Sequence, residues 1–375
     1  MKKSLLFIAS CLCATPAFSQ SSVTLYGIID TGLTYSSNEG GSHNIKEDDG
    51  INYGNRWGLT GTEDLGRGLS AIFQLENAFS LGTGKQELGG LFGRQAYVGL
   101  RDQTFGTLTL GHQYDAGSDF FISTCLGLGA CATGYGGHIG NLDGQLYGLR
   151  LDNSIKYQSP NMKGVEVEAL YAFGNTAGNF HQNSGYSGGV SYTGGPVYAA
   201  AYYTRINNPN SFNGVDPYGQ LGVTSLLGKS VATVSANGTV SDPYASTPLN
   251  LDSKSIFGGG VSYTLGNVTA KVNVVDTQLK GFGQTATLRV YEAGALYAFS
   301  PALHGIVDYQ YSKLESVHWN QFSVSLNYAL SKHTSVYAGT DVLQAHGANA
   351  VIGDSFEPSS NGHQMDVRIG MVHMF

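Results

Sequence analysis

The chain has 375 residues, of which 13% are charged and 41% are hydrophobic, and its formal net charge is −7. The charged share is about half of the roughly 25% that is usual in soluble domains, whereas glycine is about twice as frequent as usual. The abundance of apolar residues excludes a disordered chain, and the acidic balance disfavours nucleic acid as a partner. Little charge together with much glycine and tyrosine favours β-strands that have one apolar face.

The first 19 residues have the organisation of a secretory signal peptide. Two lysines follow the initial methionine, residues 5–12 are apolar, and small residues flank Phe18 at a cleavage site. We therefore expect residues 1–19 to be removed and residues 20–375 to form a single domain. A lipoprotein cleavage box at residues 8–11 is the alternative interpretation. Beyond residue 19, no apolar run reaches the roughly 18 residues that a transmembrane helix needs.

Short segments in which apolar and polar residues alternate continue from residue 22 to the C-terminus. At the start, for example, Val23 and Leu25 face one way whereas Tyr26 and Asp30 face the other, which is the period of a β-strand. The predicted strands are residues 22–35, 52–62, 68–79, 91–101, 106–113, 152–159, 164–175, 184–194, 196–207, 254–265, 267–278, 287–299, 304–315, 318–330, 333–343 and 363–375.

The connections between these strands alternate between short and long. The short ones include Gly194-Gly195 and Ser300–His304. The long ones comprise residues 36–51, 80–90, 114–151, 208–253 and 344–362. Short turns at one rim and long loops at the other are typical of outer-membrane barrels with an even number of strands. A β-sandwich gives no reason for this alternation, and the repeat of about 40 residues that marks a β-propeller is absent.

The last segment, His363–Phe375, separates its two faces most clearly. Its apolar residues from Met365 to Met371 alternate with Asp366 and Arg368. One apolar and one charged face suit lipid outside and water inside. Because every backbone group in lipid must be hydrogen-bonded, such a sheet must close on itself. We therefore predict an all-β fold, a transmembrane antiparallel β-barrel of about 16 strands.

The connection Tyr114–Leu151 is far longer than a turn, and connections of this length in compact domains are usually functional. It holds Cys125 and Cys131, the two cysteines that remain after signal removal. Export implies an oxidising compartment, so a Cys125–Cys131 disulfide is favoured, with two free thiols as the alternative. Two cysteines with only His138 nearby fall short of the usual set of metal ligands, so neither a metal nor another cofactor is predicted.

Six segments distributed over the mature chain carry a family resemblance. They read SSVTLYGIIDTGLTY, RWGLTGTEDLGRGLSAIFQLE, LFGRQAYVGL, FGTLTLGHQYD, RLDNSIKY and the terminal IGMVHMF. In these segments the chain resembles the Gram-negative general porins of the beta-proteobacterial type. The resemblance implies a homotrimer among outer-membrane lipids, with a long third loop folded into the lumen as the constriction. It also implies that Phe375 is the signal read by the barrel-assembly machinery.

The resemblance further implies an arginine cluster at the constriction, formed by Arg56, Arg94 and Arg150. Alternation places Arg56 and Arg150 on the polar face of their strands, and Lys156 with them. The same alternation places Arg94 among lipid-facing residues, unless a bulge near Gly93 turns it inward. An arginine at the membrane interface that extends towards the headgroups is the alternative for this residue.

Acidic residues of the long loop are expected to oppose these cations. The candidates are Asp115, Asp119 and Asp143. Cations on one wall and acids on the other give a transverse field that sorts solutes by charge. Because the two signs nearly balance, we expect weak selectivity. The alternative is that these residues are solvated loop carboxylates.

The predicted function is an outer-membrane channel for passive diffusion of small hydrophilic solutes and ions, and no enzymatic activity is expected. A substrate-selective porin is the nearest alternative. A barrel enzyme of the phospholipase type would need a patterned nucleophile and base, which the sequence does not provide. An adhesin that uses residues 208–253 is a third possibility and is compatible with a channel.

Overall fold

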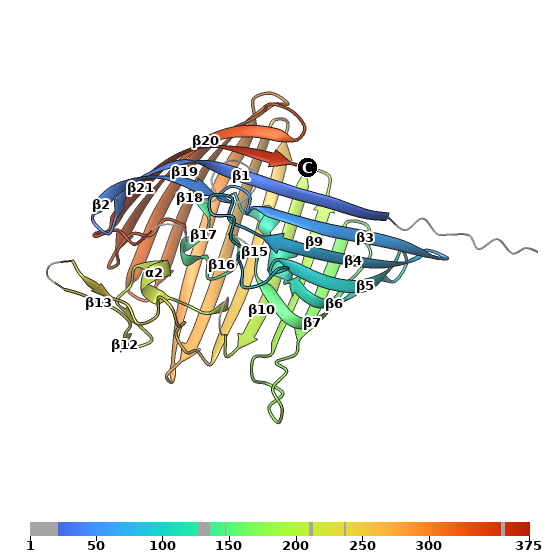
Figure 1. Ribbon diagram of the computed structural model, residues 1–375, viewed down its shortest axis with the longest axis horizontal. Helices are drawn as coiled ribbons and strands as arrows, with labels where there is room; N and C mark the ends of the chain where they lie inside the picture. Colours follow the sequence, from blue (N-terminus) through green and yellow to red (C-terminus); the bar gives the residue numbers. More distant parts are fainter. Residues whose placement is uncertain (1–21, 127–135, 147, 210–212, 236–237, 354–356) are drawn as a thin grey trace, which may run out of the picture.

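The computed structural model describes residues 22–126, 136–146, 148–209, 213–235, 238–353 and 357–375. Its long strands form one closed antiparallel β-barrel (Figure 1). The predicted signal peptide, residues 1–19, and Cys131 lie outside the described residues. In the part of the chain that is described, no helix is both long and apolar enough to span a membrane.

The barrel strands follow one another in chain order around the wall. They are β1 (Ser22–Glu39), β2 (Ser42–Asp49), β3 (Arg56–Gly66), β4 (Leu69–Ala78), β5 (Gln95–Asp102), β6 (Gly106–Tyr114), β7 (Arg150–Gln158), β8 (Val165–Ala172), β9 (Gly185–Gly194), β10 (Val197–Asn207), β15 (Ser253–Leu265), β16 (Val268–Gly281), β17 (Gln284–Ala298), β18 (Leu303–Leu314), β19 (Val317–Ala329), β20 (Thr334–His346) and β21 (His363–Met374). The sixteen predicted strands are confirmed, with ends shifted by a few residues.

Strand β2 is the additional strand, and it shares one position of the wall with β3. The first part of β1 pairs with β3 and the later part pairs with β2 on the same side. Between them the chain is held by the Asp30 carboxylate, which accepts the N–H groups of Asn52 at 2.5 Å and Tyr53 at 2.9 Å. The sequence predicted residues 36–51 as a loop because Ser42–Asp49 is polar on both faces and shows no apolar alternation.

The strands bury one face and expose the other, as their alternation predicts. In β21, Ile369 is 57% exposed, whereas its neighbour Arg368 is 0% exposed. In β18, Val307 and Tyr309 are exposed and Asp308 is buried. In these strands the exposed face carries large apolar side chains, which suits contact with lipid, whereas Asp308 and Arg368 lie on the buried face.

The connections also follow the predicted alternation, with two exceptions. At the rim that bears the long loops, β16 and β17 are joined only by Phe282-Gly283, and β18 and β19 only by Glu315-Ser316. Phe282, Gly283 and Glu315 all have positive φ angles, which the tight two-residue hairpin turns require. Strands β16 and β17 consequently extend further towards this rim than predicted.

The long loops build an apolar cluster at their rim, which the sequence analysis did not predict. The connection between β10 and β15 contains α2 (Pro217–Leu221), β11 (Ser225–Leu226), β12 (Lys229–Ser230), β13 (Thr233–Val234) and β14 (Val240–Ser241), seen at one end of the barrel in Figure 1. Its Leu221, Leu226 and Leu251 belong to a buried cluster with Leu288 and Trp319 from the barrel strands. The buried face is therefore apolar near this rim and polar further along the strands.

The barrel closes where β21 pairs with β1, and the C-terminal residue takes part in the closure. The N–H of Phe375 donates to the Gly27 carbonyl at 3.0 Å, and the N–H of Gly27 donates to the Phe375 carbonyl at 2.9 Å. A Cβ atom on Gly27 would lie 2.2 Å from the Phe375 ring, so the ring covers this glycine. Phe375 is 49% exposed, on the apolar side.

Deletion of Phe375 should reduce the amount of folded protein in the membrane. The truncated chain loses two closing hydrogen bonds, worth about 1 kcal/mol each, together with the ring that covers Gly27. The heat-modifiable band in outer-membrane fractions measures the folded protein, and Phe375→Tyr, which keeps the ring and both bonds, is the control. Equal band intensities for the truncated and native chains would contradict this role.

Candidate functional site

The segment between β6 and β7 lies against the polar part of the wall. It contains α1 (Ala116–Asp119) and two short 3-10 helices, η1 (Phe121–Thr124) and η3 (Ile139–Asn141). Its main chain is bonded by polar side chains of β10, β16, β17 and β18 in turn. The bonds join Tyr198 Oη to Phe120 O (2.6 Å), Asn273 Nδ2 to Thr124 O (3.2 Å), Lys271 Nζ to Cys125 O (2.9 Å), Leu126 N to Glu292 Oε1 (2.6 Å) and Gln310 Nε2 to Gly136 O (2.5 Å).

These contacts fall on the buried face of the strands. Asn273 lies between the exposed Val272 and Val274, and Glu292 follows the exposed Tyr291. The side chains that bond the segment therefore belong to residues that alternate with the exposed apolar residues of the same strands. Main-chain carbonyl groups of the segment that have no partner in a helix or strand accept hydrogen bonds from these polar side chains. Buried polar groups require such partners.

The three candidate arginines gather around Tyr114, where the segment begins. Arg94 Nη2 donates to Tyr114 Oη at 2.7 Å, and Arg150 Nη2 donates to the same oxygen at 3.1 Å. The Arg150 guanidinium also lies 4.8 Å from the centroid of the Tyr114 ring. A Cβ atom on Gly54 would be 3.2 Å from Arg94 and 3.8 Å from Arg56, so these two guanidinium groups flank Gly54. We call Arg56, Arg94 and Arg150 the arginine cluster.

Arg94 lies away from the apolar face on which simple alternation would place it. Strand β5 begins only at Gln95, and Arg94 follows a turn in which the N–H of Gly93 donates to the Gly90 carbonyl at 3.0 Å. Arg94 is 4% exposed, and its Nε donates to Glu76 Oε1 at 2.6 Å. The turn, rather than a bulge inside the strand, reverses the direction of its side chain.

Glu76 is the residue of this site that sequence reasoning missed. It is 4% exposed, pairs with Arg94, and accepts a hydrogen bond from Tyr26 Oη at 2.7 Å. Gln74 Nε2 donates to the same tyrosine oxygen at 2.7 Å. The signal was present in the sequence, because Gln74 and Glu76 alternate with the apolar Phe73 and Leu75 and so mark the polar face of β4.

The three predicted loop acids have different partners. Asp119 Oδ2 lies 2.5 Å from Lys156 Nζ, which is also 3.8 Å from Glu168 Oε2, so this loop acid does meet a wall cation. Asp115 instead caps α1 by accepting the N–H of Ser118 at 2.9 Å, and it accepts the Thr204 hydroxyl at 2.5 Å. Burial raises the pKa of Asp115, although these hydrogen bonds oppose the shift.

Asp143 also points elsewhere than to the arginine cluster. It is 2% exposed, and its Oδ2 lies 2.5 Å from Nδ1 of His138. Burial acts to lower the pKa of His138, but the charge of Asp143 and hydrogen bonds to Asp143 and Glu292 hold this pKa well above its usual range. Asp115 and Asp143 thus bind mainly residues of their own segment, Ser118 and His138, and not the arginine cluster.

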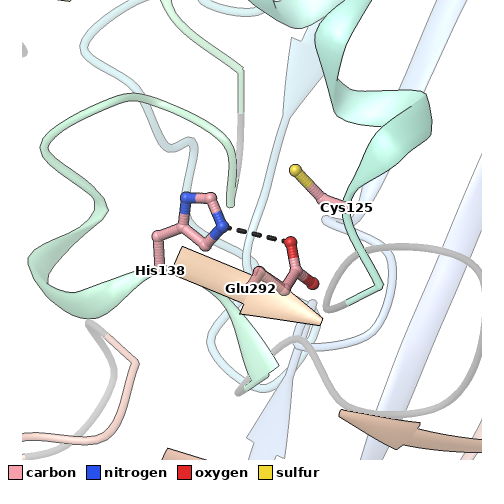
Figure 2. Close-up of side chains that lie close together, drawn as sticks. All are labelled: Cys125, His138 and Glu292. Atoms are coloured by element: carbon pink, nitrogen blue, oxygen red, sulfur yellow. Dashed lines mark hydrogen bonds and ion pairs between the residues drawn. The ribbon is translucent and has the colours of Figure 1, made fainter. Parts of the chain in front are cut away.

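Cys125 lies beside His138 and Glu292, as Figure 2 shows. It is buried and carries a free thiol, and burial is the main cause that raises the pKa of this thiol to about 12. Its predicted disulfide partner, Cys131, lies outside the described residues. The disulfide therefore stays a prediction.

Arg150 lines one of two cavities near the segment, and Lys156 lines the other. One, of about 610 Å³, is lined by residues that include His112, Arg150 and Asp152. The other, of about 260 Å³, is lined by residues that include Tyr97, Asp119, Lys156 and Gln158. The sequence singled out Arg150 in the first lining and Asp119 and Lys156 in the second.

The sequence matches the Gram-negative porin family over residues 6–345. An outer membrane porin protein of Bordetella pertussis is 35% identical over 242 residues, which cover 56% of this chain and 61%, less than two thirds, of that protein. A major outer membrane protein P.IB of Neisseria meningitidis serogroup B is 28% identical over 337 residues, which cover 82% of this chain and 92% of that protein. The solved anion-selective porin from Comamonas acidovorans has the same fold, with a TM-score of 0.76 at 22% identity over 95% of this chain and 100% of that one.

Asp115→Ala should lower the free energy of unfolding by about 1–2 kcal/mol. The variant loses the helix cap, which typically contributes about 1 kcal/mol, and leaves the buried Thr204 hydroxyl without its carboxylate partner. Denaturant titration of the folded protein in detergent measures the change. Asp152→Ala is the matched control, because the Asp152 side chain is 78% exposed. An equal, small effect of both variants would show that the cap does not stabilise the segment.

Proposed function

Because the chain belongs to the Gram-negative porin family, we propose that it forms an outer-membrane channel for passive diffusion of small hydrophilic solutes and ions. In this proposal the segment between β6 and β7 narrows the bore, and the arginine cluster sets a weak selectivity by charge. The observation that carries the proposal is the convergence of Arg56, Arg94 and Arg150 near one end of this segment, where Arg150 lines a cavity of about 610 Å³.

The path of the segment supports its role as a constriction. It leaves the wall at β6 and returns at β7, and between these points it binds β16, β17 and β18. Strand β17 is six wall positions from β7 in one direction, in a wall of sixteen positions when β2 and β3 share one. The segment therefore runs along the buried side of successive strands from β10 to β18, and in this proposal it occupies part of the bore. Free passage would then be limited to the space beside it.

The local charges favour anions in this proposal. The arginine cluster brings three positive charges, and Glu76 is the acid paired within it. Lys156 is balanced by Asp119 and Glu168. Charges at the mouths of the channel lie beyond the Debye length of about 8 Å and are largely screened from this point, so the net charge of −7 does not decide the selectivity.

Assembly and biogenesis are part of the same proposal. The family resemblance implies a homotrimer surrounded by outer-membrane lipids and inserted by the barrel-assembly machinery. The exposed apolar face, which includes Val307 and Ile369, provides the surface that lipid or neighbouring subunits would cover. Cross-linking of the protein in native membranes, followed by heating, tests the trimer: a heat-sensitive band of three chains is expected, and monomer alone would contradict it.

The double variant Arg56→Ala/Arg150→Ala should shift the reversal potential towards cations and raise the single-channel conductance. A unit positive charge about 6 Å from a passing ion favours an anion and disfavours a cation by about 0.7 kcal/mol each in water, so each lost charge should change the anion-to-cation permeability ratio about tenfold. Planar-bilayer recordings under a salt gradient measure this ratio. The conductance should rise because two large side chains are removed from the narrow section.

Arg289→Ala is the matched control for these recordings. Arg289 pairs with Asp276 at 2.5 Å and shares the exposed face of β17 with Tyr291, away from the arginine cluster. Its removal should leave the reversal potential unchanged. An unchanged reversal potential in the Arg56→Ala/Arg150→Ala variant would mean that the arginine cluster does not line the narrow section.

A further inference from the structure

A buried cluster of three different metal-ligating side chains joins the segment between β6 and β7 to the wall. Cys125 follows η1, His138 precedes η3, and Glu292 comes from the middle of β17 (Figure 2). The three residues are 4%, 3% and 3% exposed. The Cys125 sulfur, a His138 ring nitrogen and a Glu292 carboxylate oxygen all lie within 4.8 Å of one another.

We propose that Cys125, His138 and Glu292 bind a divalent transition-metal ion of the zinc type. Thiolate, imidazole and carboxylate are the three ligand types that zinc takes from proteins. Hard cations such as Mg²⁺ and Ca²⁺ prefer sets of oxygen atoms only, so the sulfur and nitrogen donors select against them. Three protein ligands leave one tetrahedral position for water.

The spacing of the donor atoms fits this coordination. Zinc–nitrogen and zinc–oxygen bonds of about 2.0–2.2 Å in a tetrahedral site separate the two ligand atoms by about 3.4 Å. His138 Nε2 and Glu292 Oε2 are 3.2 Å apart. A zinc–sulfur bond of about 2.3 Å places the sulfur about 3.6 Å from the nitrogen and from the oxygen. The three ligand atoms lie within 4.8 Å of one another, so the Cys125 sulfur would have to move by about 1 Å at most when the metal binds.

Neighbouring side chains already hold the ligands in the orientation that a metal requires. The Asp143 carboxylate lies at Nδ1 of His138, which is the carboxylate–histidine arrangement that directs the other ring nitrogen to a metal. Asn273 Nδ2 donates to Glu292 Oε2 and lies 3.6 Å from the Cys125 sulfur. Leu126 N holds the other carboxylate oxygen at 2.6 Å. Each of the three ligands thus has an outer partner.

The charges also match. One thiolate and one carboxylate neutralise a divalent cation, so a loaded site places no net ligand–metal charge in a buried place where an unpaired charge is costly. A hydrogen-bonded cluster of His138, Asp143 and Glu292 would by itself explain the two carboxylates. The Cys125 thiol joins this cluster through a hydrogen bond with His138, and a bound metal would replace that hydrogen bond and the thiol proton.

The metal and the predicted Cys125–Cys131 disulfide exclude each other, because one sulfur cannot serve both. The metal would fasten residues on both sides of positions 127–135 to β17. The disulfide would cross-link the segment only to itself and would leave His138 and Glu292 unlinked to it.

The test uses the full mature chain, folded in detergent, reduced and freed of metal. Zn²⁺ titration followed by gel filtration and metal analysis should give one ion per chain. Co²⁺ should give the visible bands of a tetrahedral site together with a thiolate charge-transfer band. Cys125→Ser, His138→Gln and Glu292→Gln should each abolish stoichiometric binding, and Asp143→Asn should weaken it by about 10–100-fold.

Cys131→Ser is the matched control, since it removes the rival disulfide and keeps all three ligands. It should bind Zn²⁺ like the native chain, and bound Zn²⁺ should slow alkylation of Cys125, its remaining thiol in the mature chain. This measurement needs no ligand variant, so it decides the matter even if one of those variants fails to fold. Channel conductance of the metal-free protein is recorded in parallel, because its loss would bear on the proposed function and not on the metal.

Three results would overturn the proposal. The first is no stoichiometric Zn²⁺ on the reduced native chain or on Cys131→Ser. The second is binding that persists unchanged in Cys125→Ser or Glu292→Gln. The third is protein isolated from membranes without reductant that holds a Cys125–Cys131 disulfide and no metal.

Discussion

The pairing of every backbone group within the wall is the constraint on which the structure depends. In hydrocarbon an unpaired N–H or C=O group costs several kcal/mol, so only a sheet without edges is tolerated. The ladder between β21 and β1, which runs from Ile28 opposite Met374 to Ser36 opposite Asp366, removes the last two edges. Phe375 continues this ladder by one residue with its two bonds to Gly27. Closure of the ring in turn divides every strand into an outer and an inner face.

Because the inner face does not contact lipid, it need not be apolar throughout. It differs in composition between two parts of the barrel. Near the rim with the long loops, inner residues such as Trp319 and Leu288 pack against loop side chains as a conventional core. Further along the strands, Asn273, Glu292 and Gln310 bind the main chain of the segment between β6 and β7. The buried charges on this face are tolerated because most have an opposite charge or several hydrogen bonds as partners.

The sequence predicted what depends on local period and missed what depends on register. Alternation of apolar and polar residues located the sixteen strands and the polar face that carries Arg56 and Lys156. It did not locate β2, whose polar residues give no period. It also could not show that Arg94 meets Glu76, because the turn before β5 decides the direction of that side chain. Asp115 and Asp143 were predicted to face wall cations, and their partners include Ser118 and His138 of the same segment, because the local fold of this segment follows from no alternation of residues.

The two sites of the segment between β6 and β7 are linked by its path. Its ends, Tyr114 and Arg150, carry the contacts of the arginine cluster, whereas its middle, at Cys125 and His138, reaches β16 and β17. In the proposed channel, the width beside the arginine cluster would depend on how firmly the middle of the segment is attached to β16 and β17. Hydrogen bonds alone give an attachment that can be lost one bond at a time. A metal bound by Cys125, His138 and Glu292 would instead attach the segment to β17 at one point, which is present only when the metal is bound. Oxidation of the Cys125 thiol would then release the metal and alter the geometry around the arginine cluster.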